Sequence, residues 1–100
     1  MSARSADVTW REFPRLREGL QYAMDGGLWL HRFSLNGIPM AHLISSDREA
    51  LLVWGLAAGL DARWIQYKPL RDIRTGERAP AWHWDLWGER LPQRRAEESP

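Results

Sequence analysis

Apolar side chains recur along the chain at two spacings, one typical of helices and one typical of strands. Over residues 14–25 they recur every three to four positions, with charged side chains on the other face, which predicts a helix that ends at Gly26–Gly27. Residues 28–33 alternate with a period close to two, which predicts a strand. No regular element is predicted before Pro14.

Turn and cap residues divide the middle of the chain. Asn36–Gly37 predicts a tight turn that pairs the first strand with a second one over 40–44, as a hairpin. Ser46, with acidic residues in the turn that follows, predicts the start of a largely apolar helix over 47–58. Residues 63–67 again alternate, and we expect the next strand there.

The remaining segments are expected to be less regular. Residues 68–80 are bracketed by prolines and predict either a mobile loop or a short excursion. Residues 81–86 are interpreted as a strand or an extended loop. Polar composition predicts flexible tails at 1–8 and 93–100, on either side of a single domain over 9–92.

Together these elements predict an α+β or small α/β domain, in which three to four short strands form a sheet with two helices packed against it. The helix over 47–58 would make a right-handed crossover if the strands on either side of it are parallel neighbours. The predicted core residues are Leu16, Leu20, Trp29, Leu43, Leu51, Trp54, Ile65 and Leu86.

Composition narrows the function classes. Fourteen basic and thirteen acidic residues nearly cancel, so charge provides no general attraction to nucleic acid or anionic lipid. The absence of cysteine excludes disulfides and thiolate metal sites, and suits a cytoplasmic protein. No signal-peptide pattern opens the chain, and no apolar run approaches the roughly 18 residues of a membrane span. The seven tryptophans indicate mainly core positions, apart from three crowded into residues 82–87.

Two histidines and one carboxylate form the candidate chemical site: His42, His83 and Asp85. On a strand, His83 and Asp85 would project to the same face. The three could ligate iron(II) as a facial triad, or a catalytic zinc with an open water position. Without metal, Asp85 could orient His83 as a general acid or base. Ordinary strand histidines are the structural alternative, and a separation above about 10 Å would exclude a shared ion.

A second group of residues alternates cations with aromatic rings. This pattern suits single-stranded nucleic acid or nucleotide phosphates, although Asp72 and Glu77 dilute the charge and no known nucleic-acid motif accompanies it. The predicted binding residues are Arg63, Trp64, Gln66, Lys68, Arg71, Arg74, Trp82 and Trp84.

Three short stretches occur in a recognisable order over roughly 40–86: His42 to Asp47 before a helix, Trp64-Ile65-Gln66, and His83-Trp84-Asp85. Together they resemble a family of small bacterial and phage proteins known as domain of unknown function 4031. His31 stands where that family usually carries an aspartate. The resemblance implies that these positions matter in the family. It implies no particular reaction, because the family has no established activity.

Three functions stay open from the sequence. The first is a binding domain that uses its Trp/Arg-rich surface for a protein or a nucleic acid. The second is a small hydrolase or nuclease-like enzyme built on His42, His83 and Asp85, with a divalent metal ion as candidate cofactor. The third is an interaction protein that buries its tryptophans in a homo-oligomer. None of the three requires a membrane.

Overall fold

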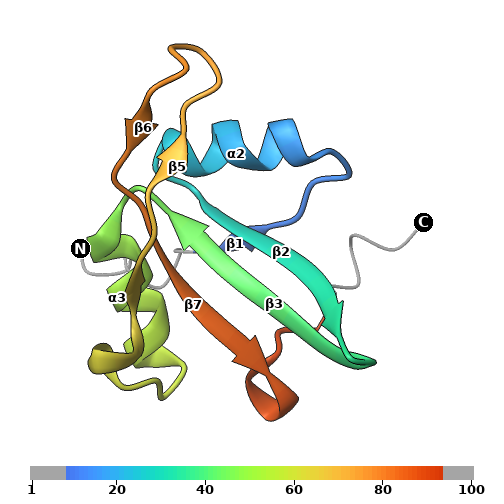
Figure 1. The fold of residues 1–100 in the computed structure, drawn as a ribbon. Helices are drawn as coiled ribbons and strands as arrows, with labels where there is room; N and C mark the ends of the chain where they lie inside the picture. Colours follow the sequence, from blue (N-terminus) through green and yellow to red (C-terminus); the bar gives the residue numbers. More distant parts are fainter. Residues whose placement is uncertain (1–8, 94–100) are drawn as a thin grey trace.

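In the computed structural model, which describes residues 9–93, a long hairpin forms the centre of the sheet (Figure 1). It consists of β2 (Leu28–Leu35) and β3 (Ile38–Ser45), which pair in antiparallel register. Asn36 and Gly37 connect them with positive φ angles of 52° and 82°, the geometry that a two-residue hairpin turn requires. The predicted hairpin and its turn are therefore confirmed.

Five strands make up the sheet, in the order β1-β2-β3-β7-β4. Strand β7 (Trp82–Trp87) is antiparallel to β3, and the short β4 (Gln66–Tyr67) pairs only with the start of β7. The unpredicted β1 (Trp10–Arg11) runs parallel to β2. The α+β class is confirmed, with more strands than expected. Because β7 lies between β3 and β4, the conditional crossover between parallel neighbours does not form.

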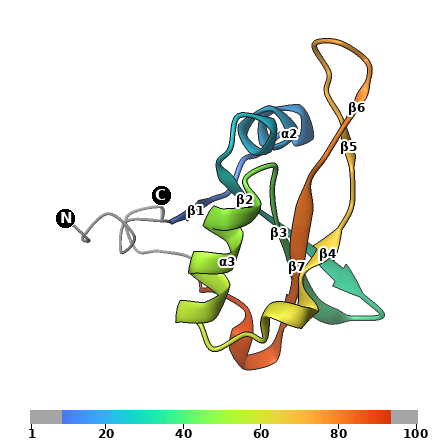
Figure 2. The same cartoon turned by 90° about the vertical axis from the view of Figure 1, so that its left-hand side faces the viewer.

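Within residues 9–93 the two α-helices are α2 (Leu16–Met24) and α3 (Arg48–Ala57), within two residues of the predicted ends. They pack on opposite faces of the sheet, as their contacts with the strands show. The core on the side of α2 includes Trp29, whereas the core on the side of α3 includes its neighbour Leu30. Figure 2 shows α3 alongside β7, with α2 crossing the end of the sheet. Neither helix has the length and apolar character needed to span a membrane.

Each helix approaches the sheet through a glycine that lies against a tryptophan. A Cβ atom placed at Gly19 of α2 would overlap the ring of Trp29. A Cβ atom placed at Gly55 of α3 would overlap the ring of Trp84 in the same way. These two contacts set how closely the helices lie on the sheet, and hence the positions of the strands that carry the candidate site.

The start of α3 differs from the prediction. Asp47, rather than Ser46, is the N-cap, and its Oδ1 accepts a hydrogen bond from the amide of Ala50 at 3.0 Å. The hydroxyl of Ser46 instead donates to the carbonyl oxygens of Ala23 and Met24, at 2.8 and 3.0 Å. Ser46 therefore ties the end of β3 to the end of α2 and is not available to cap α3.

Of the eight predicted core residues, four are buried, three are half-buried and one is exposed. Trp29, Leu43, Leu51 and Leu86 are buried, and the half-buried Leu20, Trp54 and Ile65 pack against them. Leu16 is 57% exposed. It lies in the first turn of α2, at the rim of a cavity that the helix does not cover, so its periodic position does not bury it.

Two further segments differ in part from the sequence interpretation. The strand predicted over 63–67 forms only at Gln66–Tyr67 (β4). Its first two residues belong instead to a 3₁₀ helix, η1 (Ala62–Trp64), which Asp61 caps by accepting from the amide of Arg63 at 2.9 Å. Residues 68–80 form a second antiparallel sheet of two short strands, β5 (Leu70–Arg71) and β6 (Arg78–Ala79). This hairpin projects beyond α2 at the top of Figure 2.

The chain continues after β7 into a second 3₁₀ helix, η2 (Gly88–Arg90). The predicted tails, 1–8 and 93–100, lie outside the described residues except for Gln93, which is exposed.

Candidate metal and acid–base site

The side chains of His42, His83 and Asp85 meet on one face of the sheet. His42 lies directly opposite Asp85 in the pairing of β3 with β7, and His83 precedes Asp85 by two residues on the same strand. The Nε2 atoms of both imidazoles lie 3.1 Å from Oδ1 of Asp85. Three ligand atoms, one from each residue, lie within 4.8 Å of one another. The structure thus brings together residues whose proximity the sequence left open.

The carboxylate of Asp85 is held from two sides. Gln66, at the start of β4, donates a hydrogen bond from Nε2 to Oδ2 of Asp85 at 2.7 Å. Oδ1 is withdrawn from solvent, and within residues 9–93 no hydrogen bond of good geometry reaches it, although both imidazole nitrogens are near. One carboxylate oxygen is therefore fixed by an amide, while the other faces the two histidines and lacks a full partner.

Both imidazoles are held in their neutral form near pH 7. Burial lowers the pKa of His83, and this outweighs the opposing effect of the Asp85 charge. Burial also lowers the pKa of His42, and the neighbouring His83 lowers it further. Lys68 acts in the same direction on both rings. A neutral imidazole is the form that binds a metal ion or accepts a proton.

The three residues open into a cavity of about 470 Å³ between α2 and the β5 strand. Leu16, Leu20 and Trp29 form an apolar wall, and Lys68 supplies a cation. The side chains of His42 and Asp85 are 37% and 32% exposed, so a ligand can reach them from solvent.

His31 lies in the same cavity but outside the cluster. It stands opposite His42 in the pairing of β2 with β3, and its ring stacks on Trp29 with centroids 5.2 Å apart. The group of residues able to share an ion contains the other two histidines and not His31. His31 therefore offers a matched imidazole for control experiments.

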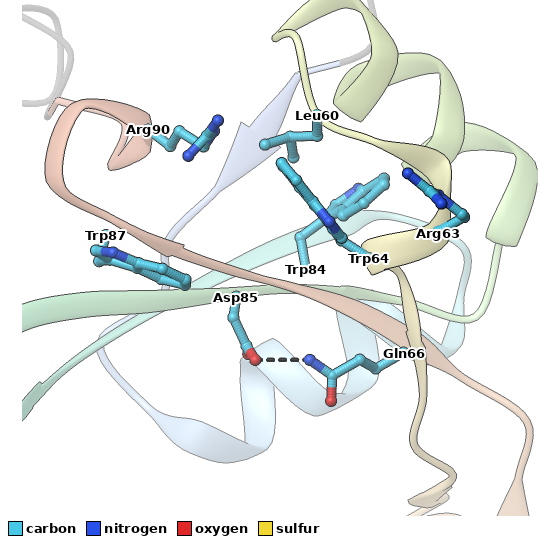
Figure 3. Close-up of a pocket in the computed structure, with 8 residues that line it drawn as sticks. All are labelled: Leu60, Arg63, Trp64, Gln66, Trp84, Asp85, Trp87 and Arg90. Atoms are coloured by element: carbon cyan, nitrogen blue, oxygen red, sulfur yellow. Dashed lines mark hydrogen bonds between the residues drawn. The ribbon is translucent and has the colours of Figure 1, made fainter.

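The predicted binding residues divide into separate regions. Arg63, Trp64, Gln66 and Trp84 line a second cavity of about 460 Å³ (Figure 3). Trp84 is only 1% exposed, so in this cavity it is part of the floor.

The other predicted binding residues lie away from the second cavity. Arg71 and Arg74 belong to the projecting hairpin, where Arg74 contacts Asp72 and Asp25 at 3.3 Å each. Trp82 packs edge-on against Tyr67, and Lys68 belongs to the histidine cavity.

The predicted binding residues omitted two residues of the second cavity, Trp87 and Arg90. Trp87 was set apart from the core with its neighbours in 82–87, and it continues the period of two through His83 and Asp85, a signal that could have placed it on the same strand. Arg90 had no such signal, because it follows the strand in η2.

The lowered pKa values predict how the stability of the metal-free protein depends on pH. The unfolded chain binds protons on its histidines near pH 6.5, whereas folded His42 and His83 bind them only at lower pH. Unfolding therefore takes up protons below about pH 6.5, and the free energy of unfolding falls as the pH is lowered. We expect a lower urea midpoint at pH 5.5 than at pH 7.5.

His83→Gln should reduce this difference between the two midpoints, and His31→Gln controls for the loss of an imidazole from the same cavity. An unchanged pH dependence in His83→Gln would contradict the prediction. Both variants are measured with a chelator present, so that bound metal does not contribute.

The cluster can act in two ways chemically. Three ligand atoms can hold a divalent ion, or the carboxylate can orient an imidazole as a general base. Both Nε2 atoms face the same oxygen of Asp85, so the donors converge on one point. This arrangement favours a shared ion over general-base catalysis. In a carboxylate–histidine pair that acts as a base, the imidazole presents one nitrogen to the carboxylate and the other to the substrate. No family model, curated protein or solved structure matches this chain.

Proposed function

We propose that this protein is a metal-dependent hydrolase whose divalent ion is held by His42, His83 and Asp85. The observation that supports the proposal most directly is that three ligand atoms lie within 4.8 Å of one another. Tetrahedral zinc with bonds of about 2.0–2.2 Å separates its ligand atoms by about 3.4 Å. The two 3.1 Å contacts to Asp85 are already close to that spacing.

The state of the ligands supports the same proposal. The lowered pKa values keep both imidazoles neutral, so binding an ion does not require them to lose a proton. The hydrogen bond from Gln66 orients the Asp85 carboxylate, as residues around metal ligands commonly do. A cation also supplies the partner that the buried Oδ1 of Asp85 lacks among the described residues.

The surroundings support hydrolysis rather than a purely structural ion. Three protein ligands leave a fourth position for water, and the adjoining cavity of about 470 Å³ leaves room for substrate. A divalent ion held by these three residues would supply a water activated for attack near pH 7. Hydrolysis would place the OH of that water on a carbonyl or phosphoryl centre and its remaining proton on the leaving group, as the bond between the two breaks. Lys68 offers a cation to an anionic substrate in the same cavity.

The test is metal binding by protein purified without a histidine tag. We expect one zinc, manganese or iron(II) ion per chain by elemental analysis and calorimetry. Binding should be lost in His42→Ala and kept in His31→Ala, since His31 lies outside the cluster. At a metal concentration 100 times the Kd, the ion should add about 2.7 kcal/mol to the free energy of unfolding.

Three outcomes would overturn the proposal. If none of the three ions binds or raises the melting temperature, the metal site is excluded. If His42→Ala binds the ion as well as the native chain, the ion lies elsewhere. If the ion binds but neither a p-nitrophenyl carboxylic ester nor bis-p-nitrophenyl phosphate is hydrolysed above the His42→Ala background, the enzymatic part fails.

A further inference from the structure

The second half of β7 has an open edge. Strand β4 pairs only with Trp82 and His83, and no strand within residues 9–93 pairs with the same edge beyond them. The amide of Lys68 donates to the carbonyl of Ala81 at 2.8 Å, which shows that Ala81 points its main-chain groups toward β4. By the alternation of an antiparallel strand, Asp85 and Trp87 direct their amides and carbonyls to the same edge.

A cavity of about 460 Å³ lies along this edge, between η1 and η2 (Figure 3). Its floor is apolar, because Leu60 is 5% exposed and Trp84 is 1% exposed. The indole nitrogen of Trp84 donates to the carbonyl of Leu51 at 2.8 Å, so this ring is fixed. The side walls are Trp64 and Trp87, which remain 49% and 52% exposed. Two large rings thus face solvent above a rigid apolar floor.

Two arginines line the rim of the cavity. The guanidinium of Arg90 lies 5.1 Å from the centroid of the Trp64 ring. Arg63 lines the opposite side, where its Nε and Nη2 donate three hydrogen bonds to the carboxylate of Asp61 at 2.7, 3.1 and 3.2 Å. The carboxylate of Asp85 also lines this cavity, at the end where Oδ2 accepts a hydrogen bond from Gln66 (Figure 3).

We infer that the cavity formed by Trp64, Trp87, Leu60, Trp84, Arg63 and Arg90 binds a nucleobase that carries a phosphate group. A planar base stacks on exposed indole rings. The open amides and carbonyls of β7 offer the paired donors and acceptors that the edge of a base needs. Arginine is suited to phosphate oxygens, and the volume lies in the range of small-molecule sites.

Other occupants fit the cavity less well. An added peptide strand would have only residues 84–87 to pair with, because β4 occupies the edge before them and η2 follows them. A second copy of this chain, paired edge to edge, would bring Arg63 and Arg90 against their own counterparts. Neither objection applies to a planar anionic ligand.

The nucleobase cavity adjoins the ion site. Asp85 and Gln66 line both cavities, so a ligand that crosses the edge of β7 touches both. Nucleotides or single-stranded nucleic acid are therefore the substrate class of the proposed hydrolase. Hydrolysis of such a ligand rests on the proposed function, whereas its binding does not require the ion.

Binding is tested by calorimetry at low salt with a chelator present, so that failure of the ion site does not affect the result. The ligands are the four ribonucleoside monophosphates, ribose 5-phosphate and a single-stranded oligonucleotide. We expect nucleotides to bind and ribose 5-phosphate not to bind. An oligonucleotide that binds at least tenfold more tightly than the monophosphates identifies a single strand as the source of the base, and equal affinities identify a free nucleotide.

Variants identify the cavity as the binding site. Trp64→Leu and Trp87→Leu should each weaken binding about tenfold or more, because base stacking is lost. Tyr67→Leu is the matched control, since Tyr67 is a 61% exposed aromatic residue outside the cavity. Arg90→Gln should weaken binding several-fold, with the exposed Arg48→Gln on α3 as its control.

Several results would overturn the inference. The inference fails if no nucleotide or oligonucleotide binds. It also fails if ribose 5-phosphate binds as tightly as the nucleotides, or if Tyr67→Leu weakens binding as much as Trp64→Leu and Trp87→Leu do. Binding of an acidic extended peptide in place of nucleotides would show that the open edge of β7 docks protein instead. Loss of metal binding with nucleotide binding retained would overturn only the proposed hydrolase.

Discussion

Replacing Asp85 by Asn should lower the affinity for the divalent ion at least about 100-fold, since even the partners of metal ligands commonly contribute 10- to 100-fold. The change keeps the shape of the side chain, and an amide oxygen can still accept the hydrogen bond from Gln66. It removes the negative charge, which is the property of this oxygen that a divalent ion requires most. Calorimetry with zinc measures the loss.

The same substitution should leave the metal-free protein folded. The Asp85 side chain is 32% exposed and its contacts with His42 and His83 are partly screened by solvent. We therefore expect the free energy of unfolding to change by less than about 1 kcal/mol. Asp72→Asn, in the projecting hairpin, is the matched control for loss of a carboxylate that contacts a basic side chain.

Protonation of the histidines cannot account for the expected loss. The charge of Asp85 raises the pKa of both His42 and His83, so removing it lowers both pKa values further and keeps the rings neutral. Weaker zinc binding by Asp85→Asn at pH 7 would then be due to the missing negative charge of the carboxylate. Unchanged zinc affinity in Asp85→Asn would show that the carboxylate is not a ligand, and a collapse of the fold would show that its role is structural.

Local signals in the sequence account for the elements that were predicted correctly. The turn at Asn36–Gly37 needs positive φ at both residues, and these residue types adopt it readily. The helix α2 ends before Gly26, whose φ of 95° favours glycine. Such signals act over a few residues, so they can be recognised without knowledge of the partner strands.

The missed elements depend on contacts between distant residues. Two-residue strands such as β1 and β5 are too short to show a period, and only their partners define them. Trp84 shows the same limit within the candidate surface. Its place in a cluster of tryptophans favoured exposure, but the absence of a side chain at Gly55 allows the ring to be buried under α3.

The candidate site was predictable in its residue types and not in its geometry. His83 and Asp85 share a strand, so the period of two predicted that they project together. His42 joins them only because β3 pairs with β7 in the register that sets it opposite Asp85. A slip of one residue would turn His42 to the other face of the sheet, and nothing in the sequence alone specified that register.

Adding one methyl group at Gly55 should destabilise the protein by about 1 kcal/mol. The new Cβ would lie 2.5 Å from Cε2 of Trp84, inside van der Waals contact. The ring cannot move aside without losing its hydrogen bond to Leu51, so α3 must shift. Overpacking of a core costs about 1–3 kcal/mol, and the better helix propensity of alanine offsets about 1 kcal/mol. Urea denaturation measures the change, and Leu56→Ala, at an exposed position of the same helix, is the control.

A double substitution shows whether the contact with Trp84 is the cause. Trp84→Phe alone should be destabilising, because it removes the hydrogen bond to Leu51 and part of a fully buried ring. Trp84→Phe removes Nε1 and Cζ2, two of the three atoms that the Gly55→Ala methyl group would overlap. The two changes together should therefore cost at least about 1 kcal/mol less than the sum of their separate effects. Additive effects would mean that Gly55 is required for the backbone of α3 and not for its approach to the sheet.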